Sequence, residues 1–404
     1  MTVSAPREEP VPVLSADGAP VVSVADSGTQ AEIRRIVREF AAAEILPHAA
    51  GWDERAEFPR DTIRQLGALG FLGPVFPERW GGAGFNYQEY AVLVEELARA
   101  DASVAITVAA HVSLAANHIY EQGTDLQRQR WLVPLASGEA LGAWSLTEPG
   151  AGSDAGGTRT TAVRDGDSYV INGSKTFTTN GSEADIAVCM ASTAPERGTR
   201  GISAFVVERG TSGFRPGRKE KKLGHCASDT SEMVFEDCRV PAGNRLGAEG
   251  SGFPAAMKVL DGGRISIAAL SLGIARAAFA CAAAYAQDRK QFGRPIAAFQ
   301  GIRFPLADCR VEIEASRLLI QQAAALKDAG RPTTLESSMA KLYASETSVR
   351  VTNRAVQVLG GYGYTRSYPV ERYLRDARLM PIGEGTSEIQ RLLIARSVLG
   401  RVGS

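Results

Sequence analysis

The sequence contains few residues of the kinds that bind metals, and their spacing does not form a metal site. Among its 404 residues are five cysteines and four histidines. The cysteines include no C-x-x-C pair and the histidines are scattered, so no zinc pattern is present. The sequence therefore predicts no metal site, and its cysteines indicate reduced thiols in a cytoplasmic protein.

An excess of charge is also missing, because 45 basic residues balance 45 acidic ones. This balance removes the strongest electrostatic argument for a nucleic-acid or anionic-membrane partner. The N-terminus lacks a basic segment followed by an apolar stretch, and no uninterrupted apolar run reaches the length of a bilayer span. A small molecule is therefore the expected partner.

Neither common nucleotide fingerprint occurs in the sequence. No G-x-G-x-x-G joins a strand-like run to a helical one, and there is no G-x-x-x-x-G-K-[ST]. A nucleotide-like cofactor would have to be held by another architecture.

Composition and periodicity divide the chain into four parts. Residues 1–28 are rich in Pro, Ser, Ala and acidic side chains and predict a flexible tail. Apolar residues recur at helical spacing over 29–140, and β-branched and aromatic runs closed by turn residues fill 141–252. Long helical segments return over 253–404. We expect an α+β chain with an N-terminal all-α domain, a middle β-barrel or sandwich domain and a C-terminal four-helix bundle.

Two local patterns give more detailed expectations. Asn172-Gly173 lies between two strand-like runs and predicts a β-hairpin turn. Four helical segments, ending with "SEIQRLLIARSVLG", are expected to form the bundle.

The segment "PIGEGTSEIQ" places Glu384 between two glycines, just before a helix start. Ser387 followed by Gln390 fits a capping box, so the helix is expected to begin near Thr386 or Ser387. A carboxylate on such a loop could face a ligand and act as a base. The plain alternative is a solvated turn in which the glycines supply unusual backbone angles.

Three further segments have both a functional and a structural interpretation. "WSLTEPGAGSD" could offer amide and hydroxyl donors to a heterocycle, or it could simply connect two domains. Arg289 could neutralise a phosphate, although a cation is favoured at any helix C-terminus. Gly360-Gly361 could admit a ligand to the backbone, or it could end a helix.

Five motifs occur in the order that is typical of one family. They are "WSLTEPGAGSD", "INGSKTFTTNG", "LDGGRISIA", "DRKQFGRPIAAFQ" and "QVLGGYGYTRSYPVERYLRDARLMPIGEGTSEIQ". From about residue 30 to its end the chain resembles the acyl-CoA dehydrogenases, and most of all their short-chain (butyryl-CoA) branch. The resemblance implies FAD bound without a covalent bond between the β domain and the bundle, with the acyl-CoA thioester on the other face of the flavin.

The resemblance also implies which residues bind FAD, some of them from a neighbouring subunit. These are Trp144, Leu146, Thr147, Gly152, Ser153, Phe177, Thr178, Thr179, Arg289, Phe292, Gln300, Gln357, Gly360, Gly361, Thr386 and Glu388. Phe177 stands where many relatives carry Trp, which keeps an aromatic wall but removes an N–H donor. A cofactor site shared between subunits implies a homo-oligomer, usually a tetramer in this family.

Glu384 matches the catalytic base of the family, which removes the α-proton of the thioester while the β-hydrogen passes to the flavin as hydride. Ser153, Asp261, Arg264 and Gly385 match positions that contact the substrate. Some branches carry the base on the helix just before the arginine that is Arg264 here, but that position is Gly263. Gly383 stands where many relatives have Tyr and opens space beside the base.

The implied function is FAD-dependent α,β-desaturation of a short-chain or short branched acyl-CoA to the trans-2-enoyl-CoA, with electrons passing to electron-transfer flavoprotein. Two alternatives stay open. One is an oxygen-using enzyme on the same scaffold, an acyl-CoA oxidase or a flavin monooxygenase. The other is a non-catalytic flavin- or acyl-binding partner subunit. The sequence does not specify the acyl chain or the electron acceptor. It also does not show whether the acyl group is attached to CoA or to a carrier protein.

Overall fold

The computed structural model describes residues 26–400. The predicted tail over 1–28 therefore lies outside the described residues, except at its end, where helix α1 begins at Gly28. A capping box between Ser27 and Gln30 starts this helix.

The N-terminal part is helical, as predicted. Its apolar stripes are buried: Ile33 and Val37 on α1, and Tyr90, Val94 and Leu97 on α4. The helices are α1 (Gly28–Glu44), α2 (Ala49–Arg55), α3 (Arg60–Ala68), α4 (Tyr87–Ala100), α5 (Ala102–Ala109), a π-helical turn (Ala110–Ala116), α6 (Asn117–Gln122), α7 (Asp125–Gln127) and α8 (Val133–Ala136).

Two helical stretches are long and apolar enough to cross a membrane by length and composition alone. They are Ala102–Gln122 and Gly252–Asp288. Neither stretch is an uninterrupted apolar run, because polar residues interrupt both of them. The apolar 18-residue window of the first stretch is wholly buried, and that of the second is largely buried inside the protein. Because core helices satisfy the same criterion, these stretches are weak evidence for a membrane span.

The middle part is a sheet in which the strand order is β6-β7-β3-β2-β4-β5-β8, with β1 paired to β4. A cluster of apolar side chains fills its interior, including Phe205 and Phe235. The strands are β1 (Gly142–Ser145), β2 (Thr161–Asp165), β3 (Ser168–Thr179), β4 (Ile186–Ser192), β5 (Ile202–Glu208), β6 (Phe214–Lys219), β7 (Thr230–Pro241) and β8 (Arg245–Leu246).

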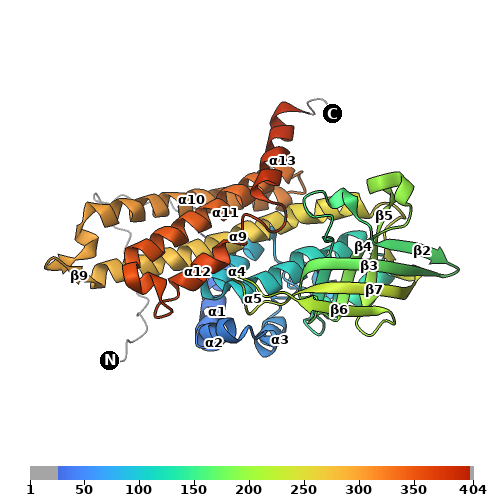
Figure 1. Cartoon of the computed structure of the whole chain (residues 1–404), viewed down its shortest axis with the longest axis horizontal. Helices are drawn as coiled ribbons and strands as arrows, with labels where there is room; N and C mark the ends of the chain where they lie inside the picture. The colour runs from blue at the N-terminus through green and yellow to red at the C-terminus, as the bar shows by residue number, and fades with distance from the viewer. Residues whose placement is uncertain (1–25, 401–404) are drawn as a thin grey trace.

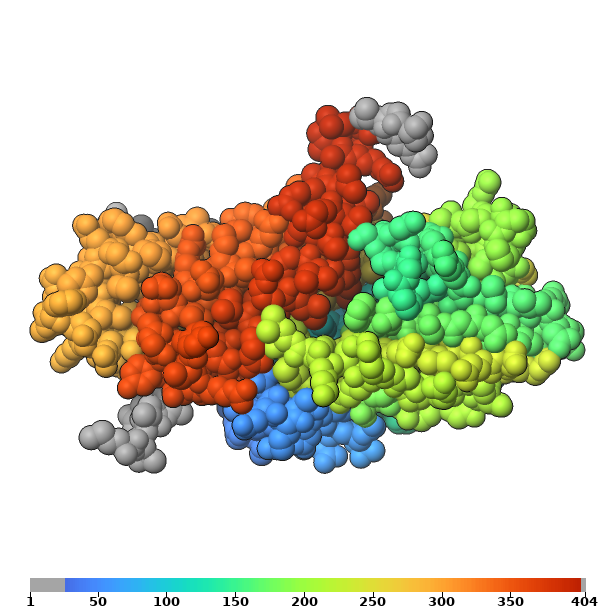
Figure 2. All heavy atoms as spheres, in the orientation of Figure 1, coloured from blue at the N-terminus to red at the C-terminus, as the bar shows by residue number. Residues whose placement is uncertain are grey.

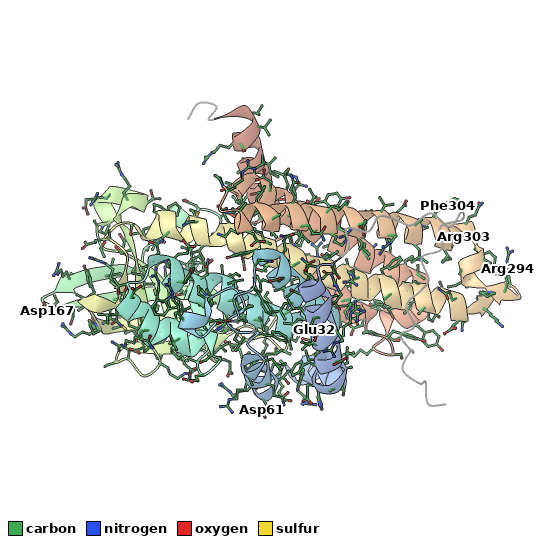
Figure 3. The ribbon with its side chains drawn as sticks, turned by 180° about the vertical axis from the view of Figure 1, so that it is seen from behind. Glu32, Asp61, Asp167, Arg294, Arg303 and Phe304 are labelled. Atoms are coloured by element: carbon green, nitrogen blue, oxygen red, sulfur yellow. The ribbon has the colours of Figure 1, made fainter. Side chains whose placement is uncertain are left out.

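The predicted turn at Asn172-Gly173 is wrong, because β3 continues through both residues. The β2–β3 hairpin instead turns at Gly166 and Asp167, and Asp167 lies at the outer tip of the domain (Figure 3). The register of β3 against β7 shifts between Ile171 and Gly173, as in a β-bulge. A Cβ on Gly173 would lie 2.6 Å from Thr160 Oγ1, so close packing of the bulge requires the glycine.

Three long helices dominate the C-terminal part: α9 (Gly252–Asp288), α10 (Gln300–Asp328) and α11 (Thr334–Leu359). They pack against one another, and α4 and the shorter α12 (Val370–Ala377) also pack on α9. The terminal helix α13 (Ser387–Leu399) contacts α11 and then projects from the body (Figure 1). Between α9 and α10 a small hairpin, β9 (Lys290–Gln291) and β10 (Arg294–Pro295), lies at the end far from the β domain.

One apolar core continues from the N-terminal helices through α9 and α11 to one face of the sheet. The β domain and the C-terminal helices therefore share a packed boundary. Figure 2 shows a hollow where the β domain, in green, meets the C-terminal helices, in red. The segment that carries Glu384 connects α12 to α13 and lies against Gly263 of α9.

Candidate active site

Glu384 lies in a tight turn between α12 and α13 and has a φ of 53°. A left-handed conformation is uncommon for a residue with a Cβ and persists where the surroundings impose it. Two backbone hydrogen bonds close the turn: Gly383 N–H donates to Leu379 O over 3.0 Å, and Ser387 N–H to Pro381 O over 2.8 Å. The turn therefore holds Glu384 in one orientation.

The Glu384 carboxylate is directed against α9. A Cβ on Gly263 would overlap Glu384 Oε2 and lie 3.0 Å from Leu114 Cδ2, so the glycine makes room for the acid. Oε2 is buried, and in the described part of the chain it has no hydrogen-bond partner. A buried oxygen left without a donor in an apolar wall is suited to accept a proton from a ligand.

Burial raises the pKa of Glu384 to about 7, against the opposing influence of the Lys341 and Arg264 cations. Removal from water disfavours the carboxylate, whereas the two cations favour it. The result is a carboxyl group that changes charge near neutral pH, as a general base requires.

Arg264 and Asp261, both predicted to contact the substrate, form an ion pair on α9 one turn apart. Arg264 is buried, and its Nε has no partner among residues 26–400. Asp261 also accepts a hydrogen bond of 2.7 Å from Thr334 Oγ1 at the start of α11. The pair therefore places an unused N–H donor close to Glu384.

Apolar and aromatic side chains surround this acid. Tyr90 on α4 is fully buried, and burial raises the pKa of its hydroxyl, so it stays neutral. Leu114 approaches Gly263, and a Cβ on Gly262 would lie 3.0 Å from the hydroxyl of Tyr87. Such a lining suits an aliphatic chain rather than a polar ligand.

Space remains on one side of the acid. A Cβ on Gly383 would meet Leu379 only at 3.8 Å or more, so a side chain could be accommodated there. That this room lies beside the carboxylate of Glu384, as expected from the sequence, stays a prediction.

Sequence reasoning missed Lys341 and misjudged Gln390. Lys341 on α11 is fully buried and donates to Gly385 O over 2.6 Å. Gln390 donates to the same oxygen over 2.9 Å. The predicted capping box is wrong: Thr386 is the N-cap, accepting from Ile389 N–H over 3.3 Å, and Gln390 turns back to the Glu384 loop instead.

The predicted flavin segment "WSLTEPGAGSD" begins on β1 and continues into a turn that two backbone hydrogen bonds close between Glu148 and Ala151. Trp144 is half-buried, and its Nε1–H donates to His118 Nδ1 over 3.0 Å. Leu146 is buried and Thr147 is half-buried, while Gly152 and Ser153 are exposed. A Cβ on Gly152 would meet nothing within 4 Å, so the backbone is open to a ligand.

A buried ion pair anchors this loop. Lys175 on β3 is fully buried and donates to Glu148 Oε1 over 2.7 Å and to Leu146 O over 3.2 Å. Glu148 also accepts from the backbone amides of Arg159 and Thr160. Burial favours the neutral acid, but Lys175 and these amides hold the pKa of Glu148 below its ordinary value. These bonds fix the start of the loop, at Leu146 and Glu148, to β3 and to the residues before β2.

The end of β3 presents an aromatic side chain. Phe177 has a φ of 54° and is 65% exposed, which is unusual for a large apolar residue. The adjacent Thr178 hydroxyl is buried and finds no partner within the described chain, and Thr179 is half-buried. An exposed ring, an unpaired hydroxyl and an open glycine backbone fit one face of a flavin ring.

The remaining predicted FAD residues fall into two places. Thr386 and Glu388 begin α13, next to Glu384. The others lie at the end of the bundle that carries β9 and β10, where Figure 3 labels Arg294, Arg303 and Phe304, opposite the β domain. This remote group comprises Arg289, Phe292, Gln300, Gln357, Gly360 and Gly361, all exposed.

The remote group has the features of a contact surface. Phe292 is 92% exposed with a φ of 50°. Arg289 caps α9, and Gly360, with a φ of 60°, caps α11. The helix-end interpretation of both positions is therefore correct, and a single chain does not bring this group to the flavin segment.

Family models match three successive stretches of the chain. They are described as the acyl-CoA dehydrogenase N-terminal domain over residues 27–139, the middle domain over 143–238 and the C-terminal domain over 250–399.

Individual relatives match over almost the whole length. A short-chain specific acyl-CoA dehydrogenase of Clostridium acetobutylicum is 51% identical over 366 residues, which are 91% of this chain and 97% of that protein. The structure of butyryl-CoA dehydrogenase from Megasphaera elsdenii superposes with a TM-score of 0.92 at 45% identity, over 93% of this chain and 99% of that one. A chain solved in work on the electron transferring flavoprotein of Acidaminococcus fermentans has a TM-score of 0.93 at 46% identity, over 94% of this chain and 100% of its own.

Proposed function

The chain belongs to the acyl-CoA dehydrogenase family, whose members depend on FAD, and from this premise we propose that it desaturates short-chain or short branched acyl-CoA thioesters to trans-2-enoyl-CoA with Glu384 as the base. The observation that carries the proposal is the buried Glu384 Oε2, which faces Gly263 and has no partner in the described chain.

In the proposed reaction the α C–H bond breaks and its proton passes to Glu384, while the β C–H bond breaks and a carbon–carbon double bond forms. FAD, when bound, supplies the acceptor for the β-hydrogen, which leaves with its bonding electron pair. Trp144, Thr147, Phe177 and Thr178 would hold the flavin ring. The exposed Phe177 ring and the unpaired Thr178 hydroxyl support this placement.

The α-proton of a thioester is far less acidic than a carboxylic acid, so the site must stabilise the developing enolate oxygen. The backbone amides of Glu384 and Gly385 make no hydrogen bond within residues 26–400. We propose that one of them donates to the thioester oxygen. Arg264, Asp261 and Ser153 would then contact the CoA arm.

We propose that the buried Tyr90 and Leu114, which lie near Glu384 and Gly263, favour a short acyl chain. The room around Gly383 supports acceptance of a branch. Turnover of butyryl-, isobutyryl-, isovaleryl-, octanoyl- and phenylacyl-CoA tests this assignment. We expect highest kcat/KM among the first three, and a preference for octanoyl-CoA would contradict it.

The proposed electron acceptor is electron-transfer flavoprotein, in line with the relative solved in work on such a protein. Fast oxidation of the reduced enzyme by oxygen would instead favour the oxidase alternative. We also propose a homotetramer in the cytoplasm. The remote group around Arg289 and Phe292 supports the assembly because it could complete an FAD site only on another subunit, and the five free cysteines suit a reducing compartment.

The pH dependence of the reaction follows from the pKa of Glu384, about 7. A base must be deprotonated, so kcat/KM with butyryl-CoA should rise as pH increases through about 7 and level off above it. Stopped-flow measurement of flavin reduction between pH 5.5 and 9, at intervals of about half a unit, checks this profile. A rate that is flat across this range would exclude Glu384 as the titrating base.

Gly263→Ala should displace the base. The new methyl group would overlap Glu384 Oε2, so the carboxylate must move away from the substrate α-carbon. A displacement of this kind costs on the order of 100-fold in rate. Gly243→Ala is the matched control, because a Cβ there meets nothing within 4 Å. Equal flavin-reduction rates in the two variants would show that the contact at Gly263 is unimportant.

A further inference from the structure

The Glu384 turn is held by a buried cation that the proposed chemistry does not consume. Lys341 lies on α11, 0% exposed, and its Nζ donates to Gly385 O over 2.6 Å. Lysine is rarely buried completely, because its ammonium group loses its hydration. A buried lysine that bonds a single carbonyl in the described chain therefore needs an explanation beyond packing.

A neutral donor already serves the same carbonyl. Gln390 Nε2 donates to Gly385 O over 2.9 Å and reaches Glu384 O at 3.4 Å. Gly385 has a φ of 93°, and a Cβ there would lie 2.6 Å from Gln390 Nε2, so this glycine admits the amide. Since Gln390 could hold the turn without a charge, the feature that Lys341 adds is its positive charge.

The positive charge of Lys341 interacts with the carboxylate of Glu384. Among charged groups, Lys341 has the largest influence on Glu384, and Glu384 has the largest influence on Lys341. Arg264 on α9 and Tyr90 on α4 also face Glu384, and Arg264, Glu388 and Glu346 also face Lys341. Burial lowers the pKa of Lys341 to about 8, so the ammonium form still predominates at neutral pH.

We infer that Lys341 is a positioning residue, which fixes the strained Glu384 turn through the Gly385 carbonyl and uses its charge to favour the carboxylate form of Glu384. The inference rests on the proposed function, because it assumes that Glu384 is the base. Gln390 shares the first role but not the second, and this difference makes the inference testable.

Three variants separate charge from hydrogen bonding. Lys341→Met removes both, Lys341→Gln removes the charge but keeps a donor, and Gln390→Met removes a donor without a change in charge. Each FAD-loaded variant is compared with the wild type in anaerobic flavin reduction by butyryl-CoA between pH 5.5 and 9, at intervals of about half a unit. Binding of crotonyl-CoA to the oxidised enzyme reports whether the site is still formed.

In both Lys341 variants we expect kcat/KM to rise with pH about one unit higher than in the wild type, because a cation that lowers the pKa of Glu384 is lost. Lys341→Met should also lower the limiting rate by about 10- to 100-fold through misplacement of the base. Gln390→Met should lower the rate, but its kcat/KM should rise at the same pH as that of the wild type. If Lys341→Met does not fold, Lys341→Gln alone still reports the shift.

If kcat/KM rises at the same pH in the folded Lys341 variants as in the wild type, the inference is overturned. A shift of this rise in Gln390→Met equal to that in the Lys341 variants also overturns it. Neither result contradicts the proposed function, because butyryl-CoA still reduces the flavin of the wild type. A wild type whose flavin is not reduced overturns the proposed function and the inference together.

Discussion

Replacing Glu384 with Gln should slow flavin reduction by butyryl-CoA by about 1,000- to 10,000-fold. The amide matches the carboxylate in shape and cannot take a proton, so the bond to the α-hydrogen no longer breaks. Binding should survive, because Glu384 Oε2 makes no hydrogen bond within the described residues that the substitution could disrupt. The measurement is single-turnover flavin absorbance, with acyl-CoA affinity determined in parallel.

Glu236→Gln provides the matched control for this variant. Glu236 lies on β7 with a largely exposed side chain paired to Arg215, so the same substitution there should leave the rate unchanged. Near-normal flavin reduction by Glu384→Gln would refute the assignment of the base, whatever the control shows.

Lys175→Met should give the largest loss of stability. It removes one partner of a buried ion pair and leaves the Glu148 carboxylate without its cation, and breaking such a pair costs about 3–5 kcal/mol. Because Lys175 holds Leu146 and Glu148 at the start of the predicted flavin loop, the variant should also release FAD more readily. Thermal unfolding and the fraction of flavin retained after gel filtration measure the two effects.

Lys219→Met is the comparison for this variant, because Lys219 lies exposed on β6. It should change neither the melting temperature nor the retained flavin. If Lys175→Met behaved in the same way, the ion pair would not be what fixes the flavin loop.

Local signals in the sequence predicted the turn that carries Glu384, whereas its role as the base was implied by the family resemblance and stays a prediction. Two glycines beside the acid and a helix start a few residues later are enough to predict a turn that faces a helix N-terminus. The α-β-α order and the buried apolar stripes of α1 and α4 were likewise predictable from periodicity. Features of this kind depend on neighbours only a few residues away.

The incorrect predictions share a different cause. Asn172-Gly173 carries a strong turn signal, but pairing of β3 with β7 along its length keeps both residues in the strand, and the glycine forms a bulge against Thr160. Gln390 fits a capping box, but contact with the Gly385 carbonyl competes for its amide. In both cases tertiary contacts override a local preference.

Lys341 illustrates what a single sequence does not reveal. It lies 43 residues before Glu384, and its hydrogen bond to Gly385 spans 44 positions. No periodic pattern distinguishes a buried lysine on a mixed helix from one that extends into water. The predicted FAD residues give a second example, because they lie at two ends of the molecule. Only the fold shows that one chain does not bring them together.

Anaerobic mixing of the FAD-loaded wild type with butyryl-CoA is the decisive test of the proposed desaturation. We expect rapid loss of flavin absorbance together with one equivalent of trans-2-enoyl product per flavin, at a rate that rises with pH through about 7. Flavin that stays oxidised with butyryl-CoA and with the branched short-chain thioesters, although FAD is bound, would contradict it.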